Sequence, residues 1–141
     1  VKLLRLIQEK SVRPVGEARE QPVDVRILSA THKNLAELVA QGRFREDLFY
    51  RINVIELRVP ALRERAGDIP DLAEAILVRL SRRMQIDTPE LAPDALDRLQ
   101  RYGFPGNVRE LENVLERAMT LCVGGRITAD DIQLRATARP P

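Results

Sequence analysis

Gly42-Arg-Phe-Arg-Glu-Asp-Leu-Phe-Tyr-Arg-Ile-Asn-Val54 decides the fold, together with Phe104-Pro-Gly-Asn-Val-Arg-Glu-Leu-Glu-Asn113 further along the chain. Each stretch places arginine where a phosphate group can use it: Arg45 and Arg51 in the first, and Arg109 in the second. A guanidinium group is always charged and presents a rigid fork of donors, which suits phosphate oxygens better than the ammonium group of lysine. The first stretch also contains apolar residues at helical spacing that can anchor it: Phe44, Leu48, Phe49 and Ile52. These features indicate a protein that responds to a nucleotide.

The composition is typical of a cytoplasmic protein. Of the 141 residues, 44% are hydrophobic, but no apolar run approaches the length that crosses a membrane. The single cysteine, Cys122, excludes a disulfide within the chain. Lys and Arg number 23 against 21 Asp and Glu, so the formal net charge is only +2 and charge alone does not argue for a nucleic-acid partner.

The residues before Pro60 favour a parallel sheet with flanking helices. Residues 24–30 and 54–59 are short runs of aliphatic and β-branched residues that predict strands, and the segment between them has helical spacing closed by Gly42. Residues 2–8 predict a further helix.

After Pro60 the pattern becomes helical. Amphipathic spacing predicts a helix with Pro70 in its first turn and a second helix that begins around Pro93. Asn107 with Glu110 three residues later resembles a capping box that opens the third helix. The expected core stripe of this helix is Val108, Leu111, Val114, Leu115 and Ala118. Thr128 with Asp131 opens a last short helix in the same way.

Two of these helices also permit a different class of function. Residues 93–121, with the turn at 103–107, superficially resemble a helix-turn-helix, which would make the chain a DNA-binding module. The second helix, however, carries Glu110, Glu112 and Glu116, and acidic side chains on a recognition helix repel phosphates.

The residues GRFREDLFYRINVIELRVPALRERAGDIP and FPGNVRELENVLERA resemble the central AAA+ ATPase domain of the NtrC family, the bacterial enhancer-binding proteins. Members of this family activate RNA polymerase that carries sigma-54, and many are response regulators of two-component systems. The resemblance implies an α/β AAA+ P-loop NTPase fold. Residues 1–61 would form the C-terminal strands and helices of the α/β subdomain, 62–135 the all-α lid and 136–141 the start of a linker.

The same resemblance implies roles for six residues. Arg45 and Arg51 correspond to arginine fingers that act in trans on the nucleotide of a neighbouring subunit. Thr31 and His32 occupy the first sensor, where the family usually has Thr-Asn, so the histidine changes the hydrogen-bonding geometry. Arg109 of the Gly-Asn-Val-Arg-Glu-Leu motif corresponds to the second sensor. Val108 would be a wall of the adenine pocket, and the alternative is that it belongs to the core of the helix.

The resemblance also implies partners and cofactors. The expected assembly is a homo-oligomeric ring, a hexamer or heptamer, that contacts sigma-54 RNA polymerase through a separate loop and DNA through a separate domain, with no membrane contact. ATP and Mg²⁺ would bind the intact domain. The chain contains no GxxxxGK[ST] phosphate-binding loop, so we expect it to bind neither tightly, to hold no metal and to be inactive as an ATPase by itself.

Overall fold

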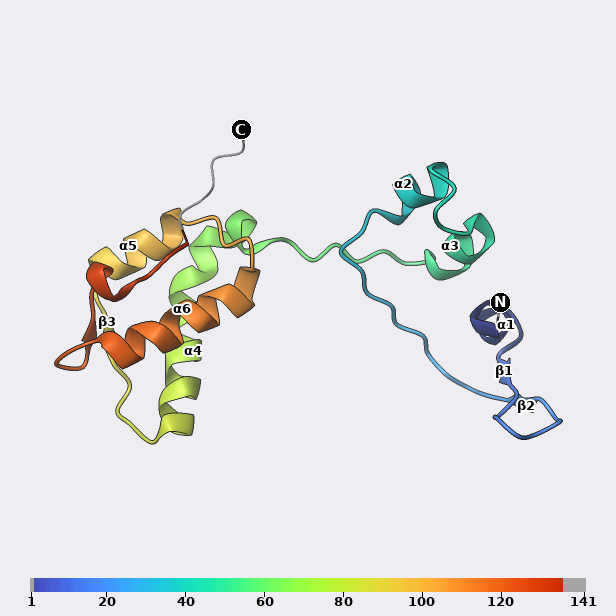
Figure 1. The fold of residues 1–141 in the computed structure, drawn as a ribbon, viewed down its shortest axis with the longest axis horizontal. Helices are drawn as coiled ribbons and strands as arrows, with labels where there is room; N and C mark the ends of the chain where they lie inside the picture. Colours follow the sequence, from blue (N-terminus) through green and yellow to red (C-terminus); the bar gives the residue numbers. More distant parts are fainter. Residues whose placement is uncertain (1, 136–141) are drawn as a thin grey trace. The chain divides into compact units, whose positions relative to one another are not determined.

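The computed structural model describes residues 2–135, which divide into two compact units, 1–58 and 59–141 (Figure 1). The expected linker at 136–141 lies outside the described residues. None of the helices in the described part is both long and apolar enough to cross a membrane.

The first unit consists of short helices and one small hairpin. Helix α1 (Lys2–Glu9) is followed by β1 (Ser11–Val12), which pairs antiparallel with β2 (Gln21–Pro22). Helix α2 (Leu35–Ala40) begins after Asn34, whose side-chain Oδ1 accepts a hydrogen bond from the Glu37 amide at 3.3 Å. Helix α3 (Glu46–Ile52) contacts both α1 and α2. The predicted helices are therefore confirmed in this unit.

The predicted strands at 24–30 and 54–59 are not formed in the structure. Both segments lack hydrogen-bonded strand partners within residues 2–135, and their aliphatic side chains are exposed, with Leu28 at 85% and Leu57 at 82%. A strand is stable only where a neighbouring strand satisfies its amide and carbonyl groups, and aliphatic composition does not supply that neighbour. The prediction of these strands is wrong for this structure.

The second unit is helical. It contains η1 (Leu62–Asp68), α4 (Ile69–Met84), α5 (Pro93–Arg101), α6 (Asn107–Leu121) and η2 (Ala129–Asp131). The strands β3 (Glu90–Leu91) and β4 (Arg126–Ile127) form a short parallel pair that ties the segment before α5 to the one after α6. Figure 1 shows α4 and α6 packed against each other.

The hydrophobic core lies entirely in this second unit. Within residues 2–135, every buried residue falls between Leu62 and Ile132, and the first unit has only half-buried and exposed side chains. The apolar faces of the helices supply the core through Ile69, Ala73, Leu77, Leu80, Ala95, Leu99, Leu111, Leu115 and Ala118. The unit therefore has the apolar interior that an independently folding domain needs.

Of the two predicted capping boxes, the structure forms the one at Thr128 but not the one at Asn107. Thr128 and Asp131 form the predicted capping box, with the Thr128 amide donating to Asp131 Oδ2 at 2.9 Å. Asn107, predicted as the N-cap of α6, is instead the first residue of the helix and has a positive φ of 51°. Its side-chain oxygen is used elsewhere, because it accepts a hydrogen bond from the Leu62 amide at 2.9 Å.

We predict that the two units differ in stability. Backbone amides of α6, whose apolar face is buried, should exchange with solvent far more slowly than those of residues 24–30 and 54–59, which lack pairing partners. Hydrogen exchange at several protein concentrations measures this. Protection of the two extended segments that appears only at high concentration would indicate pairing between copies. Equal protection of these segments and α6 in a monomeric sample would contradict the prediction.

Candidate functional site

The two candidate arginine fingers lie at opposite ends of α3. Arg45 precedes the helix and Arg51 lies in its last turn, and both are exposed. The helix is held to its unit by residues that are half-buried, as the sequence predicted: Phe44, Leu48, Phe49 and Ile52. At a rise of about 1.5 Å per residue, the two Cα atoms are on the order of 9 Å apart along the helix. The guanidinium groups can therefore contact a partner at two separate points.

The two arginines differ in what they already bind. Arg45 forms a bidentate pair with Asp47, through Nε to Oδ1 at 3.1 Å and Nη2 to Oδ2 at 2.7 Å. The hydrogen bonds from Arg45 lower the pKa of Asp47 below its ordinary value of 3.8, and the Leu48 amide adds to this effect. Arg51 has no hydrogen-bond or ion-pair partner among the described residues. Arg51 is thus immediately available to an incoming anion, whereas Arg45 must exchange a carboxylate for it.

Thr31 and His32 lie on exposed backbone just before α2. The Thr31 hydroxyl accepts a hydrogen bond from the Lys33 amide at 3.1 Å, which makes a local turn. The sequence placed both residues at the carboxyl end of a strand, but residues 24–30 are unpaired in this structure. A paired strand that would orient these two side chains is therefore not formed within the described residues.

Arg109 lies in the first turn of α6 and faces a concavity of about 310 Å³. The concavity is lined by Pro105, Gly106, Arg109, Glu110, Asn113, Val114, Arg117, Gln133 and Arg135. Arg109 and Arg117 have no hydrogen-bond or ion-pair partner among residues 2–135. Arg109 lies at the start of the helix, where amide N–H groups and the helix dipole also favour negative charge, and Arg117 lies about two turns further along α6, so together they provide a site suited to an anion.

The turn that precedes α6 is held by Glu110. Its Oε1 accepts from the Gly106 amide at 2.9 Å and its Oε2 accepts from the Tyr102 hydroxyl at 3.0 Å. Burial, followed by the hydrogen bond to Glu110, raises the pKa of Tyr102 above 10.0. Tyr102 also packs edge-to-face on the buried Phe104 ring, with centroids 4.8 Å apart. Both carboxylate oxygens of Glu110 are thus engaged in the turn, and Glu110 forms no ion pair with Arg109, although it lines the same concavity.

Sequence reasoning was wrong about Val108 as a core residue and missed two arginines. Val108 is 44% exposed, and it does not line the concavity beside Arg109. The helical spacing predicted that Val108 would be buried. Val108 lies at the N-terminal end of α6, however, before the part of the helix that packs into the core. Arg117, at i+8 from Arg109, shares the concavity, and that spacing was the signal available in the sequence. Arg135 joins it from the segment after η2, which only the tertiary structure reveals.

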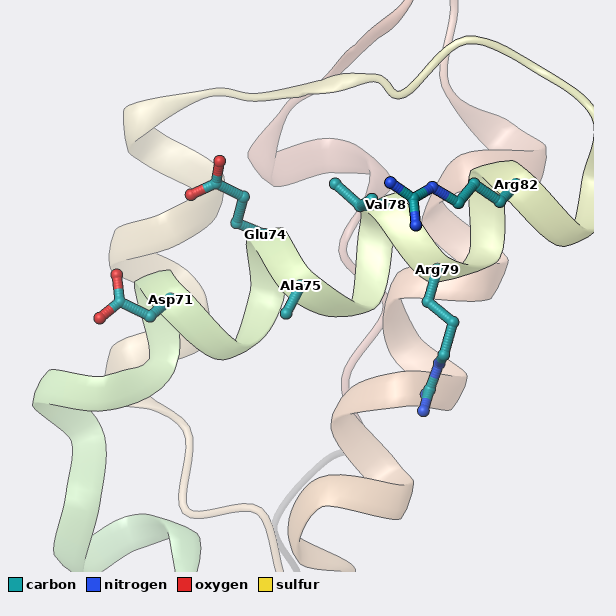
Figure 2. Close-up of a pocket in the computed structure, with 6 residues that line it drawn as sticks. All are labelled: Asp71, Glu74, Ala75, Val78, Arg79 and Arg82. Carbon is teal, nitrogen blue, oxygen red and sulfur yellow. The ribbon is translucent and has the colours of Figure 1, made fainter.

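A second concavity, of about 540 Å³, lies along the outer face of α4 (Figure 2). Asp71 and Glu74 mark one end of it, and Arg79 and Arg82 mark the other. Arg79 is paired with Glu112 of α6 at 2.8 Å. None of the residues predicted to act on a nucleotide lines this surface.

The structure gives no support to the helix-turn-helix alternative. The helix that would read DNA, α6, packs on α4 and buries Leu111 and Leu115 there. Its acidic residues are also engaged with α4, because Arg79 pairs with Glu112 and Arg83 pairs with Glu116 at 3.2 Å. The side of α6 turned away from the core carries Glu112 and Glu116 as well as Arg109 and Arg117, so it is not the predominantly basic surface that a recognition helix offers to DNA phosphates.

The candidate residues divide over the two units. Thr31, His32, Arg45 and Arg51 belong to the first unit, and Arg109 belongs to the second. No group of three or more His, Cys, Asp or Glu side chains in the part of the chain that the structure describes could hold a metal ion.

Family models match both units. Residues 63–141 match the AAA+ ATPase lid domain, and residues 1–58 match the Sigma-54 interaction domain.

Similar proteins agree with these matches. The response regulator protein PilR of Pseudomonas aeruginosa is 61% identical over 134 residues, which are 95% of this chain and 30% of PilR. The transcriptional regulatory protein ZraR of Salmonella typhimurium is 46% identical over 99% of this chain and 32% of ZraR. Crystal structures of NtrX from Brucella abortus, in complex with ADP and with ATP, each match with a TM-score of 0.85 and 40% identity. Each match covers 94% of this chain and 31% of the NtrX chain.

The helical second unit is therefore the lid of an AAA+ ATPase. The chain belongs to the NtrC family of sigma-54-dependent activators and corresponds to the C-terminal part of their AAA+ domain, which confirms the fold class predicted from the sequence. It spans about a third of the length of the curated relatives that it matches.

We predict that Arg45 controls the titration of Asp47. The folded-state pKa of Asp47 lies below 3.8, so the pair contributes stability above that pH and loses it as the pH falls through the folded value. In Arg45→Gln, the Asp47 carboxyl should titrate at a higher pH than in the unmodified chain, as followed by carbon NMR. Arg51→Gln is the matched control, because Arg51 forms no hydrogen bond or ion pair with Asp47 and is not among the causes of its lowered pKa. The same Asp47 midpoint in both variants would contradict the prediction.

Proposed function

We propose that this chain supplies the sensors, arginine fingers and lid of an ATPase that activates transcription. The ATPase couples hydrolysis in a homo-oligomeric ring, a hexamer or heptamer, to remodelling of the closed promoter complex of sigma-54 RNA polymerase. The observation that carries this proposal is the set of unpaired guanidinium groups at Arg51, Arg109 and Arg117, two of which line the concavity at the start of α6, within a chain of this family.

Arg109 acts as the sensor of nucleotide phosphates in the lid. It lies in the first turn of α6, where unpaired amides and the helix dipole favour an anion, and it has no carboxylate partner to displace. Because Arg109 is carried by the packed lid, a phosphate contact with it constrains the position of the whole unit. ATP supplies the phosphoryl group, and the similarity to NtrX, which was solved in complex with ATP, supports this choice of nucleotide.

Arg45 and Arg51 act as arginine fingers on the nucleotide of a neighbouring copy. Both project from the ends of a helix whose apolar residues hold it to the first unit, so Arg51 can reach another subunit directly and Arg45 can do so by exchanging Asp47 for the phosphate. A finger stabilises the charge that develops on the transferred phosphoryl group, which is worth about 10³ to 10⁵ in rate. The Arg45–Asp47 pair keeps Arg45 oriented in the absence of that neighbour.

Thr31 and His32 form the first sensor, which detects the γ-phosphate. The Thr31 hydroxyl remains able to donate, because in the local turn it acts as the acceptor for the Lys33 amide. His32 offers one ring nitrogen as donor or acceptor in place of the amide usual in the family. No magnesium ligand is assigned to the described residues, and Mg²⁺ would neutralise phosphate charge when bound in the intact domain.

The proposed setting is the bacterial cytoplasm. The relatives are named as a response regulator and a transcriptional regulatory protein, which supports a regulator of transcription. Contact with sigma-54 polymerase and with DNA would use a loop and a domain other than the residues described above.

Mixing subunits of the full-length protein tests the fingers. Arg45→Ala or Arg51→Ala should lower ATP turnover by about 10³-fold or more while nucleotide binding is largely kept, because each arginine acts on the neighbour's nucleotide. Mixing either variant with a variant of the phosphate-binding loop should restore part of the activity. Arg43→Ala, three residues before α3, is the matched control. Arg58→Ala is less suitable, because Arg58 already has an interaction partner in the folded chain. Failure of every mixture to recover turnover under assembling conditions would contradict action in trans.

Arg109→Ala tests the sensor in the lid. The loss of a charge-assisted hydrogen bond costs roughly 1.5 to 3 kcal/mol, so ATP affinity or turnover of the full-length protein should fall by at least tenfold. Arg126→Ala, on the exposed part of β4, is the matched control. Wild-type affinity, turnover and assembly in Arg109→Ala would remove Arg109 from the nucleotide site.

A further inference from the structure

Asn107 makes a hydrogen bond that joins two distant parts of the lid. Its side-chain Oδ1 accepts from the backbone amide of Leu62 at 2.9 Å, although the two residues are 45 positions apart. Leu62 is only 3% exposed and begins η1, directly after the exposed segment Val59–Pro60 at which the second unit begins. The bond therefore ties the first turn of α6 to the first buried residue after the junction of the two units.

The same turn of α6 carries Arg109. Asn107 is two residues before Arg109, and the backbone around both is fixed by the Glu110 carboxylate, which accepts from the Gly106 amide and the Tyr102 hydroxyl. A Cβ atom on residue 106 would lie 2.8 Å from Glu110 Cβ, so the turn is closely packed. A displacement of Arg109 thus moves a rigid turn, and Asn107 moves with it.

We propose that Asn107 is a positioning residue that couples the anion contact of Arg109 to the segment 59–62 joining the two units. The inference rests on the proposed function, because it takes the anion at Arg109 to be the phosphate of the nucleotide. When Arg109 engages the phosphate, the Asn107–Leu62 bond transmits the movement of the α6 turn to the start of η1. Without that bond, Arg109 still binds and Leu62 stays packed in the core, but the backbone at the start of η1 is held less firmly to the turn that carries Arg109.

The chemistry of asparagine fits both demands of this position. Its φ of 51° lies in the left-handed region, which glycine and asparagine adopt at the least cost among residues. The Leu62 amide also requires a side-chain acceptor, because it is buried at the start of η1 and cannot use the hydrogen bonds inside that helix. Glycine meets the first demand only, whereas aspartate meets both. Asn107→Gly and Asn107→Asp therefore separate the hydrogen bond from the backbone conformation.

The first measurement reads the bond directly. In the 141-residue chain, amide exchange of Leu62 followed by nitrogen-15 NMR should accelerate about tenfold in Asn107→Gly, because the acceptor is lost, and should stay within about twofold in Asn107→Asp. Gln85→Gly is the matched control. Gln85 also has a positive φ, of 56°, at the end of α4, and its side chain accepts no backbone amide in the described part of the chain.

The second measurement reads the coupling in the full-length protein. Asn107→Gly should lower kcat for ATP by about threefold to tenfold while KM stays within about twofold, since Arg109 still binds. Asn107→Asp is kept for the exchange measurement, because its added negative charge lies two residues from Arg109. Gln85→Gly should leave both parameters unchanged. The thermal unfolding midpoint of each variant shows whether a fall in kcat reflects a smaller folded fraction.

Several outcomes would overturn the inference. Wild-type kcat in Asn107→Gly, with the Leu62 amide deprotected, would show that the bond is not used in turnover. A loss of kcat in Asn107→Gly that matches the loss of folded protein would assign Asn107 a purely structural role. These results differ from failure of the proposed function itself, in which Arg109→Ala would bind and hydrolyse ATP normally.

Discussion

The burial of the apolar face of α6 against α4 is the constraint on which the rest of the lid depends. Leu111 and Leu115 are fully buried in this contact, and α5, η1 and η2 pack around it. Each such leucine contributes on the order of 1.5 to 3 kcal/mol when it is removed from water. The surface pairs Arg79–Glu112 and Arg83–Glu116 lie beside the contact and add little to stability, so the buried apolar stripes decide which helix faces meet.

The position of Arg109 follows from this packing. Once α6 is fixed on α4, residues 102–106 must connect the end of α5 to the first turn of α6. The Glu110 carboxylate holds this connection by accepting hydrogen bonds from the Tyr102 hydroxyl and the Gly106 amide. The arginine is left exposed beside a concavity and forms no ion pair among the described residues, because Glu110, which lines the same concavity, is bonded to the turn. A rigid support and an unpaired charge are the two properties that a phosphate sensor needs, because the contact must move the lid and must not be satisfied in advance.

The first unit follows a different logic. It has no buried residue in the part that the structure describes, and its helices are held by half-buried apolar side chains. Residues 54–59 expose aliphatic side chains, and the ends of α3 expose arginines. Both surfaces are suited to contact with another polypeptide chain. Under the proposed function, the arginines at the ends of α3 would act as fingers only when a neighbouring subunit is present.

The sequence by itself determined the family, the helices of both units, the lid core and the candidate arginines, because periodicity and long motifs are local properties that survive without coordinates. It failed at 24–30 and 54–59, where aliphatic composition predicts strands but pairing depends on a partner that composition does not specify. Only the tertiary structure decided that Val108 is exposed, and that Asn107 serves Leu62 rather than its own helix. The physical reason is that burial and long-range hydrogen bonds depend on which segments meet in space, and residues 62 and 107 meet only after α6 has packed on α4.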